Sequence, residues 1–168
     1  MTVSVLSSDA VYITMTGRSV WALLNAYYAV LRETKFRPTQ IIILSETEHA
    51  GQITVVKKGL AILSEGFGIA PQVYVEQIPT GDFVDAGRKI SARIKAGRKQ
   101  GSKVAIDITP GRKALVAGAL IPLASISVDH VFYLQITSTD DAAKPYMMIP
   151  LLSQQLRDFR APTPQVVP

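Results

Sequence analysis

Two basic residues follow a turn in the stretch 103–113, and their position is suited to binding an anion. The stretch begins as an apolar strand, carries an acid at Asp107, turns, and then shows Arg112 and Lys113. A run of small apolar residues over 114–124 predicts a helix directly after them. The first amides of a helix have no internal partner, and its dipole is positive at that end. A phosphate group is therefore the ligand that this corner fits best.

The turn itself has the composition expected before such a helix. Pro110 fixes φ for the first central position, and Gly111 allows the positive φ that a type II turn needs at the next. Thr109 adds a hydroxyl beside them. Asp107 has two possible roles, as an acid within the site or as an acceptor for the turn amides. We favour the second role.

The elements that must position this corner alternate regularly along the chain. Apolar runs predict strands, and apolar residues at helical spacing predict the helices between them. The predicted strands cover 11–16, 40–45, 72–78, 103–107 and 130–136, and the helices 20–34, 45–66, 82–99 and 114–124. This alternation predicts an α/β fold, a Rossmann-like, open, mostly parallel sheet with helices on both faces.

The end of the chain departs from the alternation. The apolar run 146–152 follows a loop too short for a crossover helix, so we expect a C-terminal antiparallel edge strand or hairpin there. Residues 153–159 are expected to form a last helical turn or two. One domain over 1–157 and a Pro-rich tail or linker over 158–168 follow from this pattern.

Ligands of such sheets bind at the carboxyl ends of the strands, which brings four loops together. All four loops carry Ser or Thr hydroxyls, three carry Gly and two carry a cation. Each Ser or Thr could equally be a helix cap, and we expect Ser19 to cap the first helix. Together with Asp107, the candidate ligand-binding residues are Thr16, Gly17, Arg18, Ser19, Ser45, Thr47, Thr80, Thr109, Pro110, Gly111, Arg112 and Lys113.

Composition and spacing exclude several classes of function. The 168 residues contain no cysteine, which removes disulfides and thiolate chemistry and fits a cytoplasmic protein. No segment is long and apolar enough to span a membrane. The glycine spacings of dinucleotide-binding and Walker A loops are missing, and His49 and His130 do not have metal-ligand spacing. We therefore expect no metal and no cofactor.

The net charge of +5 favours an anionic partner. Basic residues gather on the predicted helix 82–99, which leaves a nucleic-acid-binding domain as an alternative. The inward spacing of Ile90 and Ile94 also fits an ordinary helix with a solvated basic face.

The stretch Asp107-Ile-Thr-Pro-Gly-Arg-Lys113 resembles the D-x-[ST]-x-G-x-[KR] signature of the CRISPR-associated Rossmann-fold sensor domains, the CARF family. The loop 16–19 matches the family's other ligand loop in position and type. The small-residue helix after the signature and the segment 146–151 are also similar, so that the resemblance extends to about residue 156.

The resemblance implies a sensor domain of a type III CRISPR accessory protein, acting in antiviral defence. Its ligand would be a cyclic oligoadenylate second messenger, tetra-adenylate before hexa-adenylate, bound across a homodimer. Some members are metal-independent ring nucleases, in which the ribose 2′-OH attacks the adjacent phosphate to give a 2′,3′-cyclic phosphate. Arg18, Ser19 and Lys113 would be the catalytic residues here. Members usually carry an effector domain, and none is visible, which leaves a stand-alone protein or part of a longer one.

Overall fold

A single six-stranded sheet forms the centre of the molecule. The computed structural model describes residues 9–161, and the following concerns these residues. The strand order is β3-β2-β1-β4-β5-β6, and every neighbouring pair is parallel except β5 and β6. The strands are β1 (Ala10–Met15), β2 (Gln40–Glu46), β3 (Gln72–Ile78), β4 (Lys103–Asp107), β5 (His130–Ile136) and β6 (Gln154–Asp158).

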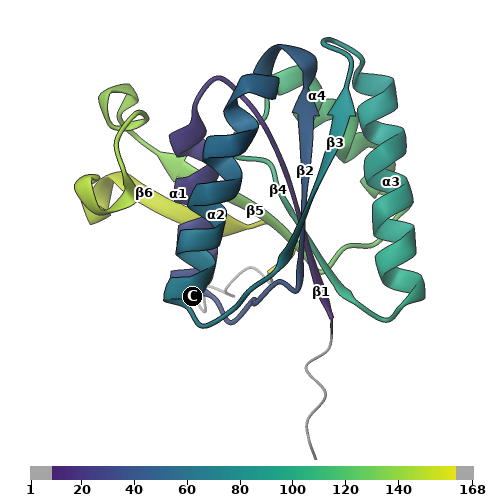
Figure 1. The fold of residues 1–168 in the computed structure, drawn as a ribbon, viewed down its shortest axis with the longest axis horizontal. Helices are drawn as coiled ribbons and strands as arrows, with labels where there is room; N and C mark the ends of the chain where they lie inside the picture. Colours follow the sequence, from purple (N-terminus) through teal and green to yellow (C-terminus); the bar gives the residue numbers. More distant parts are fainter. Residues whose placement is uncertain (1–8, 162–168) are drawn as a thin grey trace, which may run out of the picture.

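Helices cover both faces of this sheet, as Figure 1 shows. The helices α1 and α2 lie on one face, and α3 and α4 lie on the other. Their bounds are Val20–Glu33 (α1), Ile53–Gly66 (α2), Phe83–Lys99 (α3) and Lys113–Leu120 (α4). Short 3₁₀ helices are Thr47–Gln52 (η1), Ile121–Ala124 (η2), Thr139–Asp141 (η3), Tyr146–Met148 (η4) and Leu151–Ser153 (η5). The predicted α/β class is confirmed.

The apolar run of β2 supplies side chains to both helical layers. Ile41 and Ile43 pack in the core beneath α1 and α2, while Ile42 and Leu44 pack beneath α3 and α4. All four are almost completely buried. Full burial of each such side chain contributes about 1.5–3 kcal/mol, so the unbroken apolar run is what a strand covered on both faces requires.

The antiparallel edge strand lies later in the chain than the sequence indicated. Residues 146–152 form the turns η4 and η5, and the strand is β6, in the segment 153–159 where a helical turn was expected. Prolines precede both η4 and η5, and proline cannot donate a hydrogen bond to a strand ladder. Of the predicted tail, residues 162–168 lie outside the described part of the chain.

The second helix also begins later than predicted. Ser45 is the penultimate residue of β2, and the chain forms η1 before α2 starts at Ile53. The expected helix 45–66 is therefore two elements, and Ser45 is not a helix cap. Within residues 9–161, none of the helices is both long enough and apolar enough to cross a membrane.

The order of the strands reverses between β1 and β4. From β1 the chain passes to α1 on one face, and from β4 it passes to α4 on the other. The loops that follow these two strands therefore diverge and leave a crevice at the carboxyl edge of the sheet, which is where α/β sheets of this type bind ligands.

Candidate functional site

The loop after β1 is held at both ends, by Thr16 against β2 and by Ser19 at the start of α1. Thr16 is 1% exposed, and its hydroxyl lies 3.5 Å from both the Leu44 carbonyl oxygen and Ser45 Oγ. Ser19 caps α1, because its Oγ accepts a hydrogen bond of 3.3 Å from the Ala22 amide. The cap predicted at Ser19 is thus confirmed, and it leaves the exposed Arg18 at the tip of the loop.

The loop after β4 contacts the first loop through glycine. A Cβ on Gly17 would lie 1.8 Å from the Pro110 carbonyl oxygen, so the two backbones could not meet with any other residue at 17. Gly111 is needed for a similar reason, because a Cβ there would lie 2.2 Å from Met15 Sδ. The positive φ expected at Gly111 is wrong: among the described residues only Gly68, Gly81 and Gly101 have one.

Asp107 holds the second loop from below. It is completely buried, and its carboxylate accepts hydrogen bonds from the Thr109 amide (2.9 Å) and the Thr14 hydroxyl (3.0 Å). Burial raises the pKa of Asp107 to about 6, and the hydrogen bonds from Thr109 and Thr14 only partly oppose this effect. Thr109 in turn accepts a hydrogen bond from the Leu134 amide at 2.9 Å, which ties the loop to β5.

Between the two loops lies a cavity of about 440 Å³. It is lined by the tips of both loops and the start of both helices, namely Arg18, Ser19, Ala22, Pro110, Gly111, Arg112 and Lys113. Arg18 and Lys113 make no ion pair with any described residue. Two unpaired cations and the first amides of α4 give this cavity the character of an anion site.

Arg112 differs from its two cationic neighbours. Its Nη2 lies 2.5 Å from Glu46 Oε1 and 3.0 Å from Glu48 Oε1, and its Nε donates to Glu46 Oε2 at 3.0 Å. Sequence reasoning missed Glu46, which directly follows the candidate Ser45 and is fully buried at the end of β2. The sequence does contain one sign of this residue, because an acid that directly ends an apolar strand is expected to need a cationic partner.

The candidates from the other two loops lie around Glu46 and do not line the cavity. Ser45 Oγ donates to the Glu46 carbonyl (3.4 Å), and Thr47 donates to the Ile78 carbonyl (3.2 Å). Thr80 accepts a hydrogen bond from the Glu48 amide at 3.2 Å. The structure thus joins the loops after β2 and β3 into a support beside the cavity, with Arg112 as its link.

One group within residues 9–161 has the ligand types of a metal site. Ligand atoms of Glu46, Glu48 and His49 lie within 4.8 Å of one another. The three residues are close in sequence, but only the η1 turn brings His49 back toward Glu46. Arg112 pairs with both carboxylates, so each of them has a cationic partner without a metal ion.

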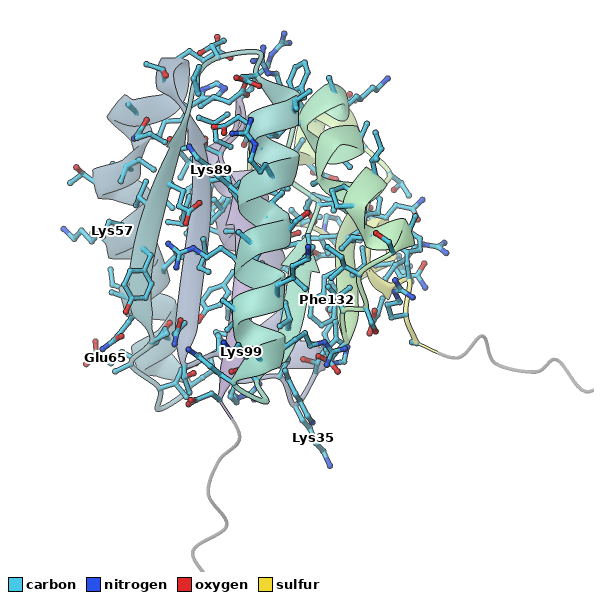
Figure 2. All side chains as sticks on the ribbon, turned by 90° about the vertical axis from the view of Figure 1, so that its right-hand side faces the viewer. Lys35, Lys57, Glu65, Lys89, Lys99 and Phe132 are labelled. Atoms are coloured by element: carbon cyan, nitrogen blue, oxygen red, sulfur yellow. The ribbon has the colours of Figure 1, made fainter. Side chains whose placement is uncertain are left out.

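The basic side chains of α3 are largely paired, and Figure 2 labels two of them, Lys89 within the helix and Lys99 at its end. Asp85 binds both Arg88 and Lys89, Glu76 binds Arg93, and Asp129 binds Arg98. Among the six basic residues of the helix, only Lys95 and Lys99 form no ion pair with the described residues. The face therefore offers a nucleic acid few free cations.

Comparison with known proteins identifies the fold. No family model and no curated protein matches this sequence. Solved structures do match. Can2 from Sulfobacillus thermosulfidooxidans, in complex with cyclic tetra-adenylate, gives a TM-score of 0.57 at 11% identity over 79% of this chain. A type III CRISPR defence DNA nuclease activated by cyclic oligoadenylate gives 0.58 at 13% identity over 77%.

Csm6 from Enterococcus italicus, bound to cyclic hexa-2′-fluoro-hexa-dAMP, gives a TM-score of 0.53 at 10% identity over 83% of this chain. This chain spans 33%, 19% and 36% of the lengths of the three proteins, respectively. All three are CARF-domain proteins, so the fold implied by the resemblance in the sequence is confirmed. At these identities the likeness concerns the fold alone.

Proposed function

We propose that this chain is a sensor domain that binds a cyclic oligoadenylate, with tetra-adenylate preferred, across a homodimer in a type III CRISPR system. The observation that carries this proposal is the cavity at the strand-order reversal, which Arg18 and Lys113 line without an ion pair to any described residue. The similar folds that bind cyclic oligoadenylates support it.

The chemistry of the ligand fits this cavity. A cyclic oligoadenylate carries one negative phosphate for each nucleotide, and cations and helix amides recognise phosphates. A ring with an even number of nucleotides can have a two-fold axis. This symmetry suits a protein dimer in which each copy offers the same cavity to one half of the ring. Each copy would then supply one Arg18, one Lys113 and one α4 N-terminus to the ring.

Isothermal titration of the chain with cyclic tetra-adenylate, cyclic hexa-adenylate and linear tetra-adenylate tests the proposal. We expect the cyclic tetra-adenylate to bind at micromolar concentration or below, and the linear molecule to bind more weakly because it must lose more conformational freedom. If neither ring binds at micromolar concentration, the proposed function is wrong.

A further inference from the structure

Glu46 connects three loops through one buried carboxylate. The residue is 0% exposed at the end of β2, and its Oε1 accepts a hydrogen bond of 3.1 Å from the Gly81 amide in the loop after β3. Both carboxylate oxygens bind Arg112, from the loop after β4. Burial alone would raise the pKa of Glu46, but the hydrogen bonds from Arg112 and Gly81 outweigh it, so the pKa is lowered and the carboxylate is ionised at neutral pH.

Glu48 meets the same guanidinium from the solvent side. Its Oε1 lies 3.0 Å from Arg112 Nη2, and its side chain is 41% exposed, against 1% for Glu46. Glu46 takes the Nε–Nη2 edge of Arg112 with the two-point geometry that a planar guanidinium prefers. The remaining nitrogen, Nη1, makes no hydrogen bond within residues 9–161.

We propose that these two carboxylates have opposite effects on phosphate binding: Glu46 positions Arg112 for the ligand, and Glu48 competes with the ligand for it. This inference rests on the proposed function, because the phosphate belongs to the proposed ring. Arg112 lines the cavity, and a phosphate bound in two-point fashion to its Nη1 and Nη2 would need the Nη2 hydrogen that Glu48 faces. Glu46 is thus a positioning residue, and Glu48 lowers the affinity.

The physical difference between the two carboxylates is their exposure. Glu46 is enclosed and cannot leave the guanidinium without leaving a buried charge unpaired, which is strongly unfavourable. Glu48 is exposed and loses little when it turns into solvent. An incoming phosphate therefore replaces Glu48 and leaves the pair of Glu46 and Arg112 intact.

Three neutralising variants test this, with affinity for cyclic tetra-adenylate measured by calorimetry. Glu48→Gln removes the competitor, and we expect binding about two- to fivefold tighter than wild type, the range set by an exposed pair. Glu46→Gln should weaken binding about tenfold, as expected when a charge-assisted hydrogen bond to the phosphate is lost. Glu65→Gln is the matched control: Glu65 is exposed near the end of α2 (Figure 2) and should leave affinity unchanged.

A double variant separates positioning from a general structural effect. In the Arg112→Ala background, Glu46→Gln should have no further effect on affinity, because the residue it positions is absent. If Glu46→Gln weakens binding equally with and without Arg112, the positioning role is overturned. The competition is overturned if Glu48→Gln binds no more tightly than Glu65→Gln.

Inorganic tripolyphosphate at low ionic strength distinguishes this inference from the proposed function. One outcome is that no ring binds, but tripolyphosphate binds most tightly to Glu48→Gln, less tightly to wild type and least tightly to Glu46→Gln. The two roles then hold, and the identity of the ligand is wrong. If the ring binds wild type and all three variants equally, the ligand stands and the two roles are overturned. If neither the ring nor tripolyphosphate binds, both proposals fall.

Discussion

Gly17 lies against the carbonyl group of Pro110, so closely that a Cβ on Gly17 would be 1.8 Å from the oxygen. The two residues belong to the loops after β1 and β4, which leave the sheet toward opposite faces. Their contact sets the distance between the two loops. This backbone-to-backbone contact therefore helps to set the width of the cavity that Arg18 and Lys113 line.

Gly17→Ala should force these loops apart. Overpacking a tight contact typically costs about 1–3 kcal/mol of stability, and the affinity for the ring should fall as the two cations separate. Urea unfolding and ring titration measure the two effects. Gly51→Ala is the control, because a Cβ on Gly51 would meet nothing within 4 Å. Equal effects of the two substitutions would contradict the role of the contact.

Lys113→Ala should weaken ring binding without destabilising the fold. Lys113 is exposed at the first position of α4, so its loss removes a phosphate contact and little packing. A charge-assisted hydrogen bond is worth about 1.5–3 kcal/mol, which predicts at least about a tenfold loss of affinity. Calorimetry with cyclic tetra-adenylate measures it.

Lys99→Ala is the matched control for Lys113→Ala. Lys99 is the last residue of α3, a helix of 17 residues whose first turn follows the carboxyl edge of the sheet, where the cavity lies. At 1.5 Å per residue, Lys99 is about 24 Å from the start of this helix along its axis. Figure 2 shows Lys99 at the far end of the helix. Its loss removes the same charge and should leave affinity unchanged at moderate ionic strength. If both substitutions weaken binding to the same extent, the ligand responds to overall charge and the nucleic-acid alternative gains support.

Asp107→Asn should stabilise the protein at neutral pH. The pKa of Asp107 is raised from 3.8 to about 6, so the ionised form is disfavoured in the folded state. Ionisation of Asp107 therefore lowers the free energy of unfolding of the wild type. The loss is absent below pH 3.8, grows as the pH rises to 6, and is complete above that, at about 2–3 kcal/mol. Unfolding free energies of wild type and variant should therefore agree at pH 3.5 and diverge by pH 7. A difference that does not depend on pH would contradict this account.

The chain should bind the ring without cleaving it. Ser19 Oγ already caps α1, and no histidine or carboxylate lines the cavity within the described residues. Incubation of labelled cyclic tetra-adenylate with excess protein and EDTA should leave the ring intact over hours. Formation of a 2′,3′-cyclic phosphate product would contradict this prediction, and loss of that product in Arg18→Ala would assign the cleavage to the cavity.

Much of the fold could be predicted because it depends on local pattern. The apolar runs and helical periodicities placed all five parallel strands. The composition of the loops after β1 and β4 indicated that the ligand site lies at the carboxyl edge of the sheet. The strand β6 could not be placed in this way, because its sequence, Gln-Gln-Leu-Arg-Asp, becomes a strand only by pairing with β5.

The site was less predictable because its decisive contacts are tertiary. Glu46 and Arg112 are separated by 66 positions, and a single acid at the end of a strand resembles a solvated residue in the sequence. Gly111 suggested a turn with positive φ, whereas the structure uses the glycine to accommodate Met15. Packing of this kind depends on which strands become neighbours, and residue types alone do not determine it.

The stoichiometry of ring binding tests the central claim most directly. Calorimetric titration of the wild-type chain with cyclic tetra-adenylate, together with the mass of the complex in solution, gives the ratio of ring to chain. A cradle that a two-fold axis uses twice predicts one ring for two chains. One ring for each chain, or no binding, would contradict the symmetric cradle between the loops that Gly17 and Pro110 hold together.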